Sequence, residues 1–264
     1  MPRSAVNLDA LRDRLRHLEQ PARHGVLPFG VAAIDAALPA GGLLLGAMHE
    51  ILSAGGDEED GAAAAGFAAG ILARLVPEGG PGPVLWCLKR PDVYGPGLAA
   101  HGLVPARLVL VAARRDEEIL WAVEEGLGEP GLAAVVGEVG RLPMVAGRRL
   151  QLAAERSGVT LLLLRRWRSA TEAAAERARP SAAATRWRVA ALPSADTAGE
   201  PGVGRPRWRV ELVRCRGGVP AEWDVEVADA TGHVSLSAGL VDRPPAASRK
   251  IGRSAAAPGR RRTG

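Results

Sequence analysis

Short runs of consecutive apolar residues alternate along the chain with stretches that carry apolar residues every three or four positions. The continuous runs are expected to be strands buried on both faces, because a half-exposed strand alternates polar and apolar residues instead. Five runs fit this description: 48–52, 83–88, 107–112, 132–139 and 158–164. Helical patterns lie between them: 61–76, 117–127 and 147–157. Strands separated by helices predict an α/β fold with a mainly parallel central sheet covered on both faces.

The pattern changes after Arg165. The runs 185–192 and 205–218 alternate apolar and charged residues with a period of two, and 221–229 follows as a further strand. In the second run, Trp208 falls on one face and Arg209 on the other. This alternation predicts half-buried antiparallel strands at the carboxyl-terminal edge of the sheet.

The two ends of the chain differ from the middle. Residues 6–20 predict a charged helix with one narrow apolar stripe, formed by Leu8, Leu11, Leu15 and Leu18. Two heptads are too short to be stable alone, so this helix packs on its own domain or docks on another chain, and both options stay open. The stretch from about residue 243 is rich in Pro, Ala, Gly and Arg and is expected to be disordered. The predicted parts are therefore an amino-terminal helix (1–24), one α/β domain (25–242) and a basic tail (243–264).

Composition places this chain among cytoplasmic globular proteins. Hydrophobic residues make up 47% of its 264 positions, enough for a substantial core. The apolar runs are far shorter than the ~20 residues that span a bilayer, and no export leader opens the chain. Cys87 and Cys215 each lie in an apolar segment, as free thiols do in a reducing compartment. We therefore expect a cytoplasmic location and no membrane contact.

Charge is distributed unevenly between the two halves. Residues 1–140 hold 11 Lys and Arg against 18 Asp and Glu, whereas residues 141–264 hold 23 against 11. The basic second half would attract a polyanion, which makes it a candidate surface for DNA. The alternative is a coding bias toward arginine, because the chain has only two lysines, Lys89 and Lys250.

No pattern indicates a metal site or a nucleophile. The histidines are scattered without metal-ligand spacing, and none stands in a nucleophile pattern: His17, His24, His49, His101 and His233. We expect no metal, no cofactor and no catalytic residue.

The segment 52–65, LSAGGDEEDGAAAA, has the glycine spacing of a phosphate-binding loop, G-x-x-x-x-G-K-[ST]. Gly56 and Gly61 follow a predicted strand and open a predicted helix, as that motif requires. Ala62 and Ala63 stand where the motif has its phosphate-binding lysine and its magnesium-binding hydroxyl. Four carboxylates between the glycines would also repel an anionic ligand. A degenerate phosphate loop competes with a plain acidic turn, while the spacing argues against a Ca²⁺ loop.

The triplet Arg-Trp-Arg occurs at 166–168, 186–188 and 207–209. Arginine and tryptophan together suit single-stranded DNA, because one binds phosphate and the other stacks on a base. In a strand, however, the two residue types point to opposite faces, so Trp187 and Trp208 are expected to cover the sheet while their arginines face solvent. The better candidates for contact with DNA or a partner follow a central strand, where such sheets place ligand sites: Arg165, Arg166, Trp167 and Arg168.

Several of these segments resemble known proteins. Residues 27–51 resemble the entry to a RecA-type ATPase core, in which a Gly-Gly turn and a strand lead into the phosphate loop. Over about residues 25–243, the order and spacing of six segments are similar to the ImuA family: LPFGVAAIDA (27–36), PVLWCLKRPD (83–92), AVVGEVGRL (134–142), LLLLRRWR (161–168), TRWRVAALPS (185–194) and GVGRPRWRVELVRCRGG (202–218). ImuA proteins are RecA-like accessory factors of an error-prone DNA synthesis complex. The resemblance implies a RecA-like core.

Carried over residue by residue, the RecA pattern implies that ATP turnover is lost. The loop lysine and hydroxyl fall on Ala62 and Ala63, and the acid that ends the second-metal strand falls on Gly137, with Glu138 on the opposite face of that strand. The water-activating glutamate falls near Lys89, which has the wrong charge for a base. The second DNA-binding loop would lie at 168–184, which looks more like a short helix. The resemblance therefore implies a protein that is not an enzyme and forms no recombinase filament.

The function implied by the resemblance is that of a non-catalytic accessory protein of translesion synthesis in the DNA-damage (SOS) response. Its implied partners are an inactive Y-family polymerase homologue (ImuB) and, through it, an error-prone replicative-type polymerase. The amino-terminal helix of RecA-type proteins packs on a neighbouring subunit, so self-association is also expected. Two alternatives stay open: an active ATPase or DNA-binding protein that uses Lys89 as an unconventional lysine, and a cell-division inhibitor similar to SulA.

Overall fold

A computed structural model describes residues 24–76, 80, 82–167, 169–194, 204–227 and 230–237. The leucine stripe of the predicted amino-terminal helix, Arg168 and the predicted tail from 243 lie outside the described residues, so the expectations for them stay predictions.

One nine-stranded sheet forms the centre of the described chain, with the strand order β11-β10-β9-β8-β3-β7-β6-β4-β5. The five continuous apolar runs form its parallel strands, as predicted: β3 (Met48–Ser53), β4 (Val84–Leu88), β5 (Leu108–Ala112), β6 (Ala134–Val139) and β7 (Thr160–Arg165). β8 (Thr185–Leu192) pairs parallel with β3 and antiparallel with β9 (Arg207–Cys215). β10 (Ala221–Val227) and β11 (Val234–Leu236) extend the antiparallel edge. The α/β fold with a mainly parallel centre and an antiparallel carboxyl-terminal edge is confirmed, and it is consistent with a RecA-like core.

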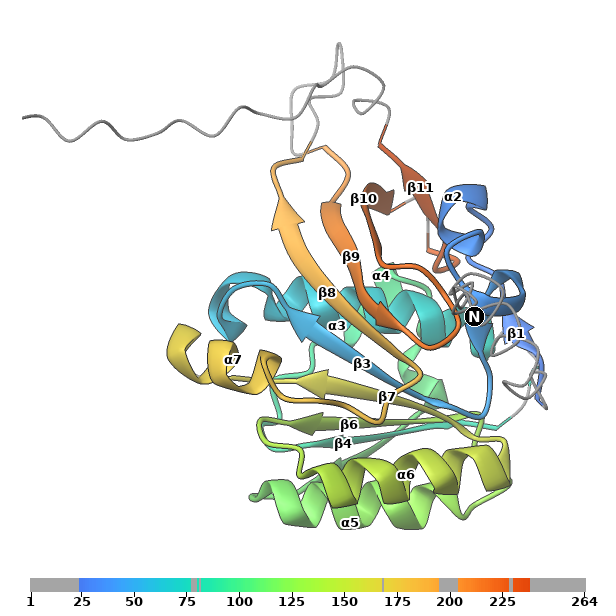
Figure 1. Ribbon diagram of the computed structural model, residues 1–264, viewed down its shortest axis with the longest axis vertical. Coiled ribbons are helices and arrows are strands. Elements are labelled where there is room, and N and C mark those ends of the chain that lie inside the picture. The colour runs from blue at the N-terminus through green and yellow to red at the C-terminus, as the bar shows by residue number, and fades with distance from the viewer. Residues whose placement is uncertain are drawn as a thin grey trace, which may run out of the picture.

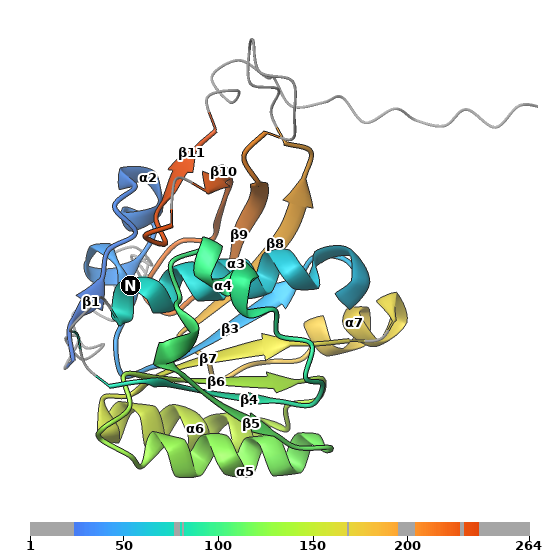
Figure 2. The same cartoon turned by 180° about the vertical axis from the view of Figure 1, so that it is seen from behind.

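Helices cover both faces of this sheet (Figure 1). α3 (Asp57–Leu75) and the short α4 (Gly95–Ala100) lie on one face, and α5 (Asp116–Leu127) and α6 (Met144–Ser157) lie side by side on the other (Figures 1 and 2). α7 (Ala170–Arg177), the short helix expected within 168–184, lies beyond the carboxyl ends of the parallel strands. Among the described residues, no helix is both long enough and apolar enough to cross a bilayer.

The inner parallel strands are mainly apolar because their side chains point alternately into two cores. Val136 of β6 and Trp86 of β4 belong to the core under α3. Their neighbours Val135 and Cys87 belong to the core under α5 and α6. All four are fully buried. A strand that contributes to two cores has no solvent face, which explains the absence of a period of two in this part of the sequence. The expectation of burial on both faces is wrong for 107–112, because β5 is the edge strand and its Val109 and Leu110 are exposed.

α3 packs closely because its inner face consists mainly of glycine and alanine. A Cβ on Gly66 would lie 2.8 Å from the ring of His101 and 3.0 Å from that of Trp208. A Cβ on Gly70 would meet the carbonyl oxygen of Gly232 at 3.1 Å. The small residues of this helix therefore allow the turn before β11 to approach its backbone.

The antiparallel edge has one apolar face and one charged face. Trp187, Trp208 and Trp223 point into the core under α3, which confirms the prediction that Trp187 and Trp208 cover the sheet. On the opposite face, Arg209 of β9 pairs with Asp224 of β10 at 2.9 Å. Arg188 of β8 pairs in the same way with Glu211 of β9. Most of the charge on this face is therefore cancelled between neighbouring strands.

Small elements before β3 were not predicted from the sequence. They are β1 (Val26–Leu27), α2 (Ala32–Asp35), the 3-10 turn η1 (Pro39–Gly41) and β2 (Leu43–Leu44); a second 3-10 turn, η2 (Pro105–Arg107), precedes β5. The carboxylate of Asp35 accepts the N–H groups of Phe29 at 2.6 Å and Gly30 at 3.0 Å. This fixes Phe29, whose ring stacks on Phe67 of α3. The segment before β3 is thereby joined to the core under α3.

Candidate functional site

The junction between β3 and α3 is where a RecA-type protein would hold nucleotide phosphates. α3 begins at Asp57, directly after Gly56, so the four residues between Gly56 and Gly61 form the first turn of the helix. Gly56 has an ordinary extended backbone (φ −71°, ψ 170°). Of the two interpretations of this segment, a degenerate phosphate loop and an acidic turn, the backbone favours the second, because residues 57–60 form a helical turn instead of an open loop.

The two alanines at the motif positions point in different directions. Ala62 is exposed on the surface of α3, and Ala63 is buried in the core under that helix. Neither side chain faces a shared cavity. The helical backbone therefore separates the two positions that a phosphate loop brings to one ligand.

Carboxylates of the protein itself bind the N–H groups at the start of α3. The Gly55 N–H donates to Asp60 Oδ2 at 2.6 Å, and the Gly56 N–H donates to Glu59 Oε2 at 3.2 Å. Asp60 Oδ1 also accepts the N–H of Ala191, at the end of β8, at 2.7 Å. The positive end of a helix dipole is a ready site for anions. In this protein Asp60 and Glu59 occupy that site.

Arg177 of α7 binds the other side of the same junction. Its guanidinium donates to the carbonyl oxygens of Ser53 (2.9 Å), Ala54 and Gly55 (3.3 Å). It also lies over the ring of Trp167, at 5.6 Å from the ring centre. The stretch just before α3 is therefore paired on both sides, because carboxylates bind the amides of Gly55 and Gly56 while Arg177 binds the carbonyls.

A second set of charges surrounds Asp57. Arg166 Nε lies 2.6 Å from Asp57 Oδ1, and its other nitrogens lie 2.8 Å from Asp92 Oδ2 and 3.5 Å from Glu138 Oε2. Arg90 also pairs with Asp57. Burial by itself lowers the pKa of Arg166, but the carboxylates of Glu138, Asp57 and Asp92 raise it above its ordinary value. The acidic residues thus bind arginines of the same chain.

The structure corrects the position of the acid at the end of β6. A Cβ on Gly137 would meet Val123 of α5 at 2.7 Å, so this position faces α5. Glu138 faces the α3 side, where Oε1 accepts the indole N–H of Trp86 at 2.9 Å. Burial raises the pKa of Glu138. A carboxylate is therefore present on the α3 side at the end of this strand, and Trp86 and Arg166 are its partners.

Lys89 lies on the opposite side of the sheet from this junction. It follows β4, and the alternation of that strand places it on the α5 side. Its ammonium group pairs with Asp116, the first residue of α5, at 2.7 Å. This position does not favour a role for Lys89 as a replacement phosphate-binding lysine.

The predicted contact residues at the end of β7 lie largely in the interior. Arg165 is 3% exposed and Trp167 is 1% exposed. Arg165 pairs with Glu176 at 2.9 Å and with Glu50 at 3.4 Å, and the indole N–H of Trp167 donates to Gly140 O at 2.8 Å. In this structure Arg165 and Trp167 are not available to DNA or a partner, while Arg166 retains limited exposure.

Glu50, which no sequence pattern singled out, is the residue around which this interior network forms. It lies fully buried in β3 and pairs with Arg186 of β8 at 3.0 Å and with Arg165 of β7 at 3.4 Å. The hydroxyl of Ser181 also donates to it. The expectation that Arg186 faces solvent is therefore wrong, because the buried charge of Glu50 requires a cation. A carboxylate inside an otherwise apolar run was the signal that could have revealed it.

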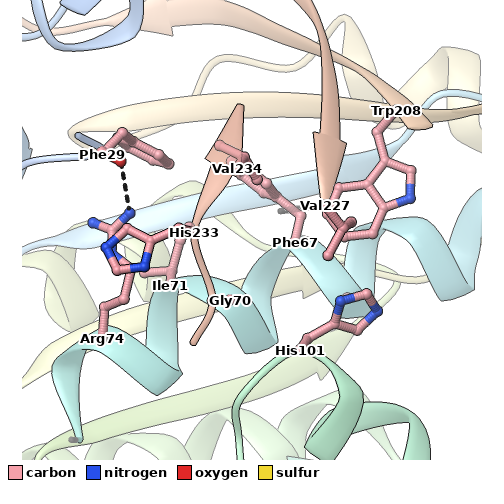
Figure 3. A pocket seen from close by; sticks show the side chains of 12 residues that line it. Phe29, Phe67, Gly70, Ile71, Arg74, His101, Trp208, Val227, His233 and Val234 are labelled. Carbon is pink, nitrogen blue, oxygen red and sulfur yellow. Dashed lines mark hydrogen bonds between the residues drawn. The ribbon is translucent and has the colours of Figure 1, made fainter. Parts of the chain in front are cut away.

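Figure 3 shows a small pocket between α3 and the turn before β11. It is lined by Phe67, Arg74, His101, Trp208 and His233, among others, and its volume is only ≈10 Å³. Burial lowers the pKa of His101. A space of this size accommodates about one water molecule, so it is no site for a substrate. Within the described ranges, no group of three or more His, Cys, Asp and Glu side chains is arranged to hold a metal ion.

Two relatives of known family match most of the chain, although no family model does. No family model matches the chain. The chain is 43% identical over 210 residues to Protein ImuA of Caulobacter vibrioides strain NA1000 / CB15N, and this match covers 79% of the chain and 85% of the relative. Protein ImuA of Caulobacter vibrioides strain ATCC 19089 / CIP 103742 / CB 15 matches with the same identity and coverage. At this identity and coverage, the chain belongs to the ImuA family, as the order of its segments predicts.

Proposed function

We propose that this ImuA-family protein is a non-catalytic, RecA-like accessory protein of error-prone translesion DNA synthesis in the DNA-damage (SOS) response. Family membership supports the mutagenesis context. One observation supports the absence of catalysis: the site before α3 is occupied by the protein's own carboxylate, because Asp60 accepts the N–H of Gly55 at 2.6 Å. A nucleotide would have to displace this carboxylate from the place where its phosphates bind.

Displacing the carboxylate would not create a working site. Asp60 also holds the N–H of Ala191, so its departure would leave two backbone donors to be satisfied. The position of the phosphate-binding lysine is Ala62, on the outer surface of the helix. The cations beside the junction are already used by the protein, since Arg177 binds its carbonyl oxygens and Arg166 binds Asp57, so a phosphate would lack the lysine and hydroxyl that the motif supplies.

In this role the protein acts through its surfaces and binds other proteins. The proposed partners are an ImuB-type inactive polymerase homologue and, through it, an error-prone replicative-type polymerase. The leucine-striped segment 6–20 is the proposed partner helix. The arginines of the antiparallel edge add little to direct DNA contact, because Arg188 and Arg209 are paired with Glu211 and Asp224.

Calorimetric titration with magnesium and ATP tests the non-catalytic proposal. We expect no binding up to millimolar ATP and no hydrolysis above background, with an intact RecA-type ATPase as the positive control. The double variant Ala62→Lys/Ala63→Thr should also fail to bind, because the lysine would extend from the exposed side of α3. Micromolar binding by the natural chain, or hydrolysis that disappears in Lys89→Ala, would contradict the proposal.

A further inference from the structure

α5 and α6 lie side by side on one face of the sheet (Figure 1), and their sequences carry opposite net charges. The sequence of α5 is DEEILWAVEEGL, with five acidic residues and no basic one. That of α6 is MVAGRRLQLAAERS, with three arginines and one glutamate. One ion pair joins the two helices, between Arg149 and Glu124 at 2.5 Å. The face therefore has an acidic half and a basic half.

A large apolar side chain is exposed at the centre of each half. Trp121 of α5 is 65% exposed, and Leu152 of α6 is 55% exposed. A folded protein gains nothing from leaving an indole in water, and exposed tryptophans are enriched at the centres of interfaces.

The charges that flank these two residues have identical spacing. Exposed Glu117 and Glu125 lie four positions before and after Trp121. Exposed Arg148 and Arg156 lie four positions before and after Leu152. Residues four apart share one face of a helix, so each helix presents a row of charge, apolar residue and charge.

None of these four charged side chains forms an ion pair with another residue of the part of the chain that the structure describes. Arg149 and Glu124, one position away, are used to hold α5 against α6. The two rows are therefore unpaired within the described fold, and each is the complement of the other.

We propose that a second copy of this chain docks on the α5–α6 face and forms a two-fold symmetric dimer. In such an interface the same patch serves both subunits, so a contact between α5 and the partner's α6 occurs twice. Facing α5 with the partner's α6 sets the acidic row of one subunit against the basic row of the other, and the two-fold axis repeats this contact. A second copy is favoured over other occupants because a purely acidic or purely basic partner would complement only one helix and would be repelled by the other.

The apolar surface continues past Trp121 toward β5. An open groove of ≈480 Å³ lies there, lined by Leu85, Val111, Trp121 and Leu132 among others. The leucine-striped segment 6–20 is a competing occupant of this part of the surface, so the experiment must separate the two.

Sedimentation velocity of the full-length chain tests the dimer. We expect the natural chain to be dimeric at tens of micromolar. The double variants Glu117→Arg/Glu125→Arg and Arg148→Glu/Arg156→Glu should each weaken self-association at least about tenfold, because like charges then face each other. Mixing the two double variants should restore a dimer, since both contacts then join opposite charges. Circular dichroism establishes that each variant is folded, and Glu222→Arg, on the exposed side of β10, is the control that should leave the dimer unchanged.

Three outcomes would overturn the proposal. The first is that the natural chain is found to be monomeric at these concentrations. The second is that both double variants dimerise as the natural chain does. The third is that the mixture stays monomeric although both variants are folded. Deletion of residues 1–22 distinguishes the competing occupant. A dimer that is lost on this deletion but is insensitive to the charge reversals is held by the leucine-striped segment instead.

Discussion

At the scale of single residues, burial decides whether a titratable side chain is charged, which the residue type alone does not show. His49 lies in β3 without exposed surface, and its Nε2–H donates to the carbonyl of Leu44 at 2.8 Å. Its Nδ1 lies 2.7 Å from the hydroxyl of Thr185. Burial lowers the pKa of His49 to about 4, although the bond to Leu44 opposes this. The sequence placed His49 within a strand but did not distinguish a neutral buried imidazole from a surface one.

The lowered pKa predicts a loss of stability in mild acid. The unfolded chain binds a proton at His49 below about pH 6.5, whereas the folded chain does so only near pH 4, so stability falls as pH drops through this window. Between pH 7 and pH 5 we expect His49 alone to lower the free energy of unfolding by about 2 kcal/mol. Urea unfolding at both pH values, compared with His49→Gln, measures this difference. Equal pH dependence in both proteins would contradict the prediction.

At the scale of elements, the first turn of α3 shows how local chemistry overrode a motif. The glycine spacing of Gly56 and Gly61 resembled a loop, but the four residues between them are acidic. Acidic residues in a first helical turn are favoured by the helix dipole and can bind its free N–H groups. Helix formation therefore satisfies the backbone that an open phosphate loop would leave for a ligand.

This predicts that Asp60 is structural. Asp60→Ala removes the acceptor of two N–H groups, those of Gly55 and Ala191, and should lower the free energy of unfolding by about 1–3 kcal/mol. Glu59→Ala is the matched control, because Glu59 accepts one exposed N–H, that of Gly56, and should cost less. Chemical denaturation measures both variants. If Asp60→Ala instead leaves stability unchanged, the carboxylate is not holding the junction closed.

At the scale of the whole molecule, the described fold is an α/β domain with one core on each face of its central sheet. The described chain begins at His24, which hydrogen-bonds the carbonyl of Glu155 in α6 at 2.9 Å. Both large cores are built from residues between Phe29 and Val225.

Deletion of residues 1–22 is expected to separate folding from partner binding. The midpoint of thermal unfolding should stay within a few degrees of that of the full chain, because no described core residue is removed. Co-purification with an ImuB-type partner should be lost. Unchanged affinity for every partner after the deletion would instead show that the leucine stripe serves local packing.

The sequence by itself determined the order of strands and helices, the change from continuous apolar runs to alternating ones, and the family. The first two features follow from periodicity along the chain, which depends on how many faces of an element are buried. The family follows from the resemblance of its segments in order and spacing. The tertiary structure alone decided which charges meet. Glu50 is more than 100 residues from Arg165 and from Arg186 along the chain. Parallel pairing of β3 with β7 and β8 brings the three together in the interior. Pairing between distant strands has no local signature, so the same arginines that resemble a DNA-binding motif in sequence neutralise a buried carboxylate in the fold.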